Sequence, residues 1–287
     1  MVANISHLLL THIKLEKGKV MKKVILKTNK LTKTFSTGGA QQHVIKNLDL
    51  EIYEGDFTVI MGASGAGKST LLYTLSGMDV PSLGSVNFMG TDISKLTSDK
   101  MALFRRKHCG FVFQQMYLLD NMSIMDNVLA CGLLVSKDTK AITAYARKLF
   151  ADVNLSEDIY IKFPTQVSGG EAQRAAIVRA LINKPPVVFA DEPTGALNSA
   201  SGAAVLDTLT KVNRSGWPQT QASAADPYSL GQSIVMVTHD IKSALRGNRI
   251  LYVMDGMIRG TCELGNYEEG NEVRRKQLGA FLADMGW

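Results

Sequence analysis

Short runs of apolar residues alternate with amphipathic stretches along most of the chain. The runs at 57–61, 187–190 and 234–238 lack the polar alternation of a half-exposed strand, which predicts strands buried on both faces. Stretches with helical spacing separate these runs, and that order is typical of an α/β fold with a mainly parallel core sheet. Further strands are expected at 24–28, 48–52, 85–88, 110–113, 250–254 and 257–262.

Helical spacing predicts helices at 98–107, 124–135, 140–153, 170–183, 199–212 and 271–285. The last of these places Val273, Leu278, Phe281 and Leu282 near one face. The block from about 92 to 165 is mostly helical and interrupts the alternation of strands and helices. We interpret it as an inserted helical subdomain.

Three segments stand apart from this pattern. Residues 1–20 have no clear period and precede Met21, so we interpret them as a non-native or disordered extension before the natural start. Residues 21–265 are expected to form one domain, and 266–287 a C-terminal helix. Residues 217–230 are rich in prolines and small polar residues, which is typical of a surface loop. We expect a neutral insertion there, with a partner contact as the alternative.

Composition narrows the class of protein. The chain has 287 residues, of which 45% are hydrophobic and 20% charged, as in ordinary globular proteins. No apolar stretch approaches the ~18–20 residues of a membrane span, so a cytoplasmic protein is expected. The three cysteines have no paired spacing, which argues against disulfides and a zinc site. The net charge of +6 comes without an aromatic-interleaved basic stripe, so no nucleic-acid partner is expected.

A glycine-rich loop follows the apolar run 57–61 and precedes a predicted helix that begins near Leu71. Strand, glycine-rich loop and helix are the context of a phosphate-binding loop, in which backbone N–H groups cradle phosphate oxygens. Lys68 can reach the β- and γ-phosphates, and the Ser69 hydroxyl can ligate Mg²⁺. The candidate nucleotide-binding residues here are Gly62, Ser64, Gly65, Gly67, Lys68, Ser69 and Thr70.

Two carboxylates, Asp191 and Glu192, end the apolar run 187–190. Ligands of such sheets lie at the carboxyl ends of the strands. Asp191 can therefore hold Mg²⁺ through its water shell, and Glu192 can accept a proton from an attacking water. A solvated turn is the alternative interpretation of the pair, and the phosphate loop favours the functional one.

A second glycine pair precedes the helix expected from about 170, and Ser168 can cap that helix. The segment 168–174 resembles the signature loop in the nucleotide-binding domain of an ABC transporter. That resemblance implies that Ser168, Gly169 and Gly170 address the γ-phosphate. It also gives roles to Phe35, which stacks on adenine, and to Gln114, which senses Mg²⁺ and contacts the membrane partner. His239 matches the switch histidine beside the γ-phosphate, although a lone histidine after a strand can also be structural.

The ordered set of motifs covers about residues 24–265. It is most similar to the macrolide-efflux, lipoprotein-release and cell-division group, and 195–199 further resembles the bacitracin-type antimicrobial-peptide branch. The fold implied is an ABC-type P-loop NTPase with an antiparallel β subdomain. Two positions depart from the usual pattern. Val167 stands where leucine is common, and Asn198, in place of aspartate, removes a charge from the dimer interface.

The resemblance implies an ATP- and Mg²⁺-dependent ATPase that forms a head-to-tail homodimer around two ATP molecules. Its partner would be a membrane permease, with the chain peripheral on the inner face of the cell membrane. Export or extrusion of antimicrobial peptides, lipoproteins or similar amphiphiles is the leading function. A mechanical or regulatory complex of the cell-division type is the alternative. A soluble ABC protein acting on ribosomes or DNA and an importer ATPase are further alternatives.

Overall fold

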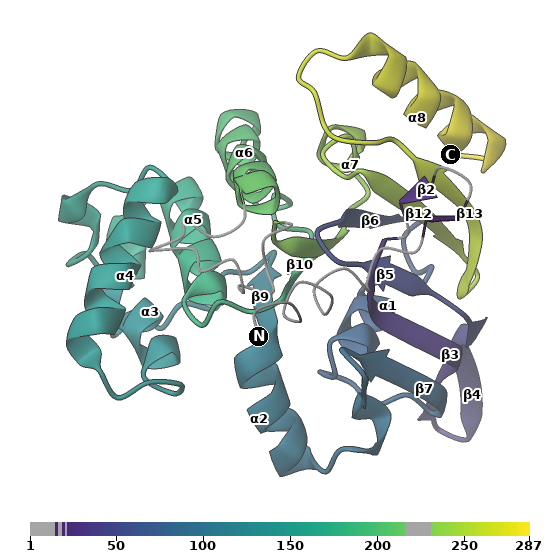
Figure 1. The fold of residues 1–287 in the computed structure, drawn as a ribbon, viewed down its shortest axis with the longest axis horizontal. Helices are drawn as coiled ribbons and strands as arrows, with labels where there is room; N and C mark the ends of the chain where they lie inside the picture. The colour runs from purple at the N-terminus through teal and green to yellow at the C-terminus, as the bar shows by residue number, and fades with distance from the viewer. Residues whose placement is uncertain (1–14, 17–18, 21, 216–230) are drawn as a thin grey trace, which may run out of the picture.

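The computed structural model describes residues 15–16, 19–20, 22–215 and 231–287 (Figure 1). Its central sheet has the strand order β13-β12-β6-β11-β10-β9. All neighbours in it are parallel except β12 and β13, which confirms the expected mainly parallel core. The strands are β6 (Phe57–Met61), β9 (Cys109–Phe113), β10 (Val187–Asp191), β11 (Ser233–Val237), β12 (Arg249–Met254) and β13 (Met257–Glu263).

Strands β6, β10 and β11 are buried on both faces, which explains why their sequences are almost continuously apolar. In β10, Val188 and Ala190 join one hydrophobic cluster, and Val187 and Phe189 join the other. The first cluster includes side chains of helices α3 (Ile124–Gly132), α4 (Thr139–Asp152), α5 (Gly169–Leu181), α6 (Ser199–Ser215) and α8 (Glu272–Asp284). The second includes α1 (Lys68–Leu75) and the β subdomain. Successive side chains of a strand point to opposite faces, so each strand contributes to both clusters.

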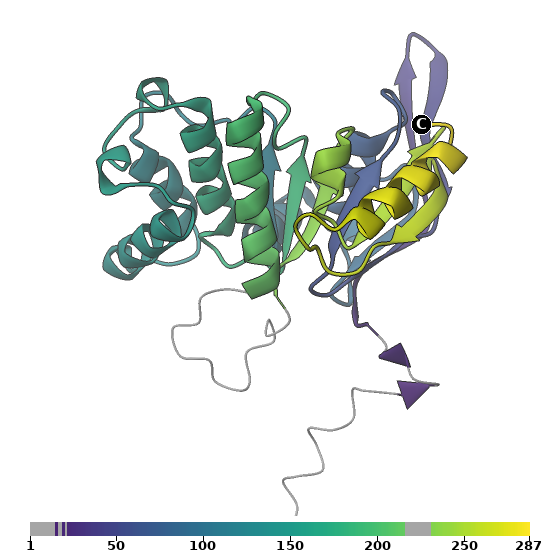
Figure 2. The ribbon, with the colours of Figure 1, turned by 90° about the horizontal axis from the view of Figure 1, so that it is seen from above.

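A second, antiparallel sheet has the order β4-β3-β7-β8, with β5 also paired to β3. Its strands are β3 (Val24–Thr37), β4 (Ala40–Leu48), β5 (Glu51–Tyr53), β7 (Leu83–Phe88) and β8 (Thr91–Asp92). The hairpin of β3 and β4 projects beyond the rest of the domain (Figure 2). Strand β3 is much longer than the expected 24–28, and the single strand expected at 48–52 is divided between β4 and β5. Polar residues on the exposed part of the hairpin hide this strand in the sequence pattern.

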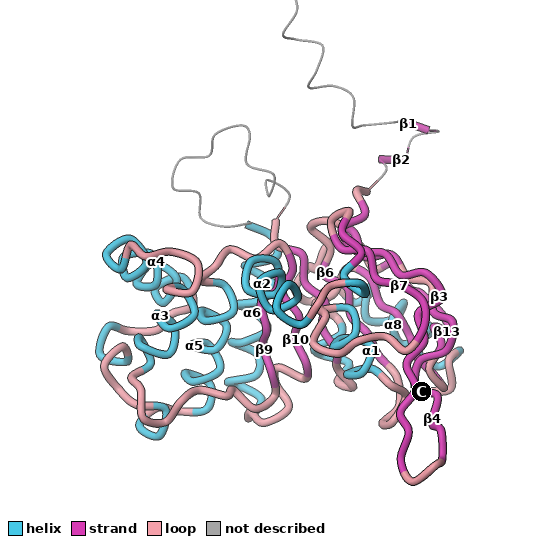
Figure 3. Tube along the Cα trace, turned by 90° about the horizontal axis from the view of Figure 1, so that it is seen from below, coloured by secondary structure: helices cyan, strands magenta, loops and turns pink. Residues whose placement is uncertain are grey.

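Helices α3 (Ile124–Gly132), α4 (Thr139–Asp152) and α5 (Gly169–Leu181) gather at the end of the molecule away from the antiparallel sheet (Figure 3). Helix α2 (Ser98–His108) precedes them, and short 3₁₀ turns lie at Ile93–Lys95, Glu157–Ile159 and Pro164–Gln166. Helices α3 and α4 pack on each other and on α5, whereas α2 packs on β9. Because β9 belongs to the core sheet, the block expected at 92–165 is divided by a core strand.

Three helices complete the domain: α6 (Ser199–Ser215), α7 (Ile241–Ala244) and α8 (Glu272–Asp284). In α8, Leu278 and Leu282 are buried, but Val273 is 76% exposed, so its expected place on the apolar face is wrong. The residue one turn before Leu278 is Arg274, which is only 4% exposed and occupies that inward position instead. Val273 lies about 100° further round the helix, on the solvent side.

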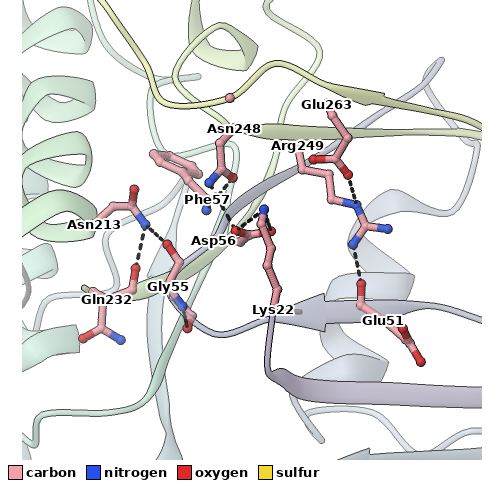
Figure 4. Close-up of polar contacts among 12 residues, drawn as sticks. Lys22, Glu51, Gly55, Asp56, Phe57, Asn213, Gln232, Asn248, Arg249 and Glu263 are labelled. Carbon is pink, nitrogen blue, oxygen red and sulfur yellow. Dashed lines mark hydrogen bonds and ion pairs between the residues drawn. The ribbon is translucent and has the colours of Figure 1, made fainter. Parts of the chain in front are cut away.

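A polar network fixes the start of β6 (Figure 4). The Lys22 ammonium donates to the Asp56 carboxylate at 2.9 Å, and the Asn248 side chain accepts a hydrogen bond from the Phe57 N–H at 2.9 Å. These contacts lie at the amino end of the strand, opposite the phosphate loop. Before them, Leu15–Glu16 (β1) and Lys19–Val20 (β2) pair as short antiparallel strands. The rest of the expected extension 1–20, and all of the insertion at 217–230, lie outside the described residues.

Candidate functional site

The loop between β6 and α1 has the backbone of a phosphate cradle. Gly62 has φ 149°, and a Cβ atom there would overlap the carbonyl oxygen of Val253. Gly67 has φ 94° and is the N-cap of α1, where a Cβ atom would lie 2.9 Å from the carbonyl oxygen of Val44. With glycine as its N-cap, the helix start has no side-chain oxygen to accept from its N–H groups. Those donors and the helix dipole form an anion site.

Lys68 lies over this loop. Its ammonium group donates to the carbonyl oxygen of Ala63 at 2.9 Å, and the residue is only 9% exposed. Burial lowers the pKa of Lys68, while the nearby carboxylates of Glu192 and Asp191 oppose that shift. A cation held in this way, with few water contacts, can interact strongly with a phosphate oxygen.

Asp191, the last residue of β10, has a hydrogen bond on each carboxylate oxygen. Oδ1 accepts from the Ser69 hydroxyl at 2.9 Å, and Oδ2 accepts from the Tyr73 hydroxyl at 2.7 Å. Burial raises the pKa of Tyr73, and the bond to Asp191 adds to that rise. A carboxylate beside a hydroxyl at the edge of a phosphate cradle is the hard oxygen donor set that Mg²⁺ prefers.

Glu192 and His239 meet at the carboxyl end of the sheet. His239 Nδ1 lies 2.8 Å from Glu192 Oε1. Because Asp191 and Val237 are register partners in β10 and β11, the residues that follow the two strands are brought side by side. Glu192 has φ 46°, a left-handed conformation that its N–H stabilises by donating to the Val237 carbonyl at 3.0 Å. In this conformation the Glu192 carboxylate contacts His239.

A cavity of about 530 Å³ opens beside this pair. Glu192, His239, Gly195 and Asn198 are among the residues that line it. Gln114 follows β9 and approaches the same loop, since a Cβ atom at Gly195 would lie 2.9 Å from its amide nitrogen. The structure therefore brings Gln114, Glu192 and His239 to one edge of the sheet, as the sequence predicts.

Phe35 lies on the projecting β3–β4 hairpin and is 42% exposed. The Lys33 ammonium lies 4.9 Å from the centroid of its ring. Val44, in the facing strand of the hairpin, contacts the phosphate loop at Gly67. The hairpin thus connects an accessible aromatic ring with the phosphate cradle, as a base-stacking residue requires.

Ser168, Gly169 and Gly170 begin α5 in the helical part of the molecule. Ser168 and Glu171 form a capping box, in which the Ser168 N–H donates to the Glu171 carboxylate at 2.7 Å. Figure 1 shows α5 on one side of β10 and α1 on the other. A single chain therefore does not bring these residues to its own phosphate loop.

Two side chains of α5 that the sequence pattern did not single out donate to carbonyl oxygens at or just after the ends of β9 and β10. Gln173 is fully buried and donates to the carbonyl oxygens of Phe113 and Pro193, both at 2.9 Å. Arg179 donates to the Met116 carbonyl at 2.6 Å. A signal was present in both cases, because a long polar side chain on the apolar side of a helix needs a partner.

A groove of about 680 Å³ lies between α1 and the helical part. Tyr73, Phe113, Tyr117 and Leu134 are among its apolar lining, and Arg179 also lines it. Tyr117 is 64% exposed and Leu134 is 58% exposed. Such a set of accessible apolar side chains is typical of a surface that binds another protein.

Within the described parts of the chain, we find no helix with the length and apolar character that crossing a membrane requires.

Comparison with known proteins gives consistent results. Residues 45–195 match the ABC transporter family. The chain is 37% identical to the bacitracin export ATP-binding protein BceA of Halalkalibacterium halodurans, over 82% of this chain and 87% of that protein. It is 40% identical to the macrolide export ATP-binding/permease protein MacB 1 of Aeromonas hydrophila, over 83% of this chain but only 34% of that protein. Among solved structures, a dimeric ATP-binding cassette in a post-hydrolysis state with ADP and Pi aligns with TM-score 0.71 and 33% identity, covering 84% of this chain and all of that one.

Proposed function

The chain belongs to the ABC transporter family and is an ATP-binding ATPase of it, and we propose that it powers a membrane permease that extrudes antimicrobial peptides or similar amphiphiles. The observation that carries this proposal is the meeting of the phosphate cradle, the Ser69–Asp191 pair and the Glu192–His239 pair at one edge of the core sheet. Each provides a separate part of phosphoryl transfer to water.

ATP binds with its phosphates on the N–H groups at the start of α1 and with its base against Phe35. Lys68 neutralises charge on the β- and γ-phosphates. Glu192 accepts a proton from the attacking water. The oxygen of that water bonds to the γ-phosphorus, and the bond from the γ-phosphorus to the oxygen of ADP breaks. His239, hydrogen-bonded to Glu192, orients the carboxylate and the γ-phosphate.

Mg²⁺ fits the oxygen donors at the edge of the cradle. Ser69, Gln114 and, through water, Asp191 would hold the ion, whose charge stabilises the β- and γ-phosphate oxygens. The 2.9 Å bond between Ser69 and Asp191 supports this assignment, because it places both donors together before any ion binds.

A second copy completes each site. Ser168, Gly169 and Gly170 begin a helix whose N–H groups can bind the γ-phosphate of the ATP held by the partner. The place of α5 and α1 on opposite sides of β10 (Figure 1) and the dimeric state of the similar cassette support a head-to-tail dimer. Hydrolysis removes the shared γ-phosphate contacts, so the dimer relaxes.

The permease binds in the groove between α1 and the helical part. Its apolar lining, including Tyr117 and Leu134, suits a partner helix, and Gln114 lies next to it at the end of β9. The chain is then held at the cytoplasmic face of the membrane through its partner. The similarity to a bacitracin export ATP-binding protein favours peptide extrusion over a mechanical, cell-division type of complex.

To test the function, the tagged Glu192→Gln chain is purified with Mg-ATP from detergent-solubilised membranes, and the bound proteins are identified. A permease with many membrane spans and a large external domain is expected, and resistance of cells to membrane-active peptides should then depend on both proteins. Recovery of ribosomes or nucleic acid in place of a membrane protein would contradict the transport role. Lys68→Ala, which should not form the ATP-bound dimer, is the control.

A further inference from the structure

The Tyr73 hydroxyl has no place in the mechanism described above, yet it touches the centre of the site. It donates a 2.7 Å hydrogen bond to Asp191 across 118 residues of sequence. Ser69, which bonds the other oxygen of the same carboxylate, lies four residues earlier in α1. The two hydroxyls therefore lie on one face of the helix and hold the two oxygens of Asp191 separately.

The main chain and the ring of Tyr73 are both held by neighbouring residues. Its carbonyl oxygen accepts hydrogen bonds from the N–H groups of Met78 at 2.9 Å and Asp79 at 3.1 Å, and from the Ser76 hydroxyl at 3.1 Å. Its half-buried ring packs against the hydrophobic cluster that contains Phe189. Because the main chain of Tyr73 is fixed by hydrogen bonds and its ring is fixed by packing, its hydroxyl can impose an orientation on the carboxylate to which it donates.

We propose that Tyr73 is a positioning residue that holds the Asp191 carboxylate in the orientation required to bind Mg²⁺. This inference rests on the proposed function, in which Asp191 holds the ion. Without the hydroxyl, Asp191 keeps its bond from Ser69, but Oδ2 is free to move as the carboxylate rotates. Metal binding must then restrict that rotation, so the affinity for the ion falls.

The ring of Tyr73 also lines the groove assigned to the permease. An occupant of the groove would therefore contact a side chain whose hydroxyl holds a metal-site carboxylate. Tyr73 therefore contacts both the docking surface and the Mg²⁺ site.

The test compares Tyr73→Phe with the unchanged chain by the binding of a fluorescent, non-hydrolysable ATP analogue. Affinity is measured in excess Mg²⁺ and in EDTA, and the ratio of the two gives the gain that Mg²⁺ provides. Tyr73→Phe should leave the affinity in EDTA unchanged and reduce the Mg²⁺ gain by roughly tenfold or more. Asp191→Asn should also reduce the gain, and the double variant should lose little more than Asp191→Asn alone.

Tyr53→Phe is the matched control, because the Tyr53 hydroxyl also donates to a carboxylate, that of Glu51 at 3.3 Å, but in the β subdomain. A normal Mg²⁺ gain in Tyr73→Phe, with a reduced gain in Asp191→Asn, would overturn the inference and leave the metal site standing. A normal gain in both would overturn the assignment of Asp191 as well. Equal losses of affinity with and without Mg²⁺, together with a lowered melting temperature, would show that Tyr73 only packs.

Discussion

At the scale of single residues, the site depends on an unfavourable backbone conformation at Glu192. A non-glycine residue with φ 46° costs of order 1–3 kcal/mol and persists only where its surroundings enforce it. Here the Val237 carbonyl and the contact with His239 do so. The position is therefore maintained for the orientation of its carboxylate.

Replacing Glu192 with Gln should reduce the rate of ATP hydrolysis roughly 10²–10⁴-fold, because the amide does not accept the proton of the attacking water. ATP binding should remain, and the ATP-bound dimer should accumulate on size-exclusion chromatography. Glu157→Gln, an exposed residue of a 3₁₀ turn, should hydrolyse ATP at the normal rate. Normal turnover in Glu192→Gln would remove this residue from the role of base.

Asn198 keeps the helix-capping role of the aspartate that is usual at this position. Its side-chain oxygen accepts from the Ser201 N–H at 2.9 Å, which caps the start of α6. Asparagine caps helices about as well as the aspartate usual at this position. The substitution therefore removes a charge from the cavity beside Glu192 without loss of the helix start.

At the scale of elements, α8 is held by one buried guanidinium. Arg274 donates to the carbonyl oxygens of Leu245, Leu264 and Gly265 at 2.8–2.9 Å, and also to that of Gly247. Leu245 and Gly247 lie just after α7, the helix that follows His239. The C-terminal helix is thereby tied to the segment that carries the switch histidine.

Arg274→Met should lower the free energy of unfolding by about 2–4 kcal/mol, because it leaves several buried carbonyl oxygens without a donor. Chemical denaturation measures the change. Arg275→Met is the matched control. Its guanidinium is exposed and, among the residues that the structure describes, pairs with Glu272 alone at 3.4 Å, so a change within about 0.5 kcal/mol is expected. Equal effects of the two substitutions would show that the buried contacts contribute nothing specific.

The two segments that flank the expected insertion are the end of α6 and the start of β11. A single side chain, that of Asn213, joins them (Figure 4). The Asn213 amide donates to the Gln232 carbonyl at 2.8 Å and to the Gly55 carbonyl at 2.9 Å. Because these two segments are already joined at the amino end of β11, any linker long enough to connect them should allow the domain to fold. This end of the sheet is opposite the phosphate loop.

Replacing residues 217–230 with a short glycine-serine linker should therefore leave the ATPase rate and the melting temperature unchanged. Asn213→Ala is the contrasting variant, and it should lower the free energy of unfolding by about 1–3 kcal/mol, since two carbonyl oxygens lose their donor. Loss of ATPase activity on replacement of the segment would contradict the interpretation of a neutral insertion.

At the scale of the whole molecule, the separation of α5 from α1 has a consequence for mixtures of variants (Figure 1). Lys68→Ala should prevent ATP binding at its own loop. Gly169→Glu should place a negative charge against the partner's γ-phosphate, while the acid remains acceptable in the first turn of a helix. Each variant alone should be inactive in both sites of its dimer.

Mixed in equal amounts, the two variants should recover roughly a quarter of the normal ATPase rate. Half of the dimers would be mixed, and each of these has one intact site, made from the loop of one chain and the signature of the other. Steady-state ATP hydrolysis measures the recovery. No recovery on mixing, with mixed dimers shown to form, would indicate that each chain completes its own site.

The sequence alone predicted the parts of this protein that are local. The phosphate loop, the acidic end of β10 and the order of strands and helices follow from contiguous residues, because turn glycines and apolar runs act over a few positions. Only the tertiary structure revealed the contacts of Tyr73 with Asp191, of Gln173 with Phe113 and of Arg274 with Leu245, which join distant segments. Such partners are decided by how helices pack on the sheet, and a residue's own neighbours in sequence do not encode that packing. For the same reason the sequence placed Val273 on the buried face of α8, where the structure has the guanidinium of Arg274.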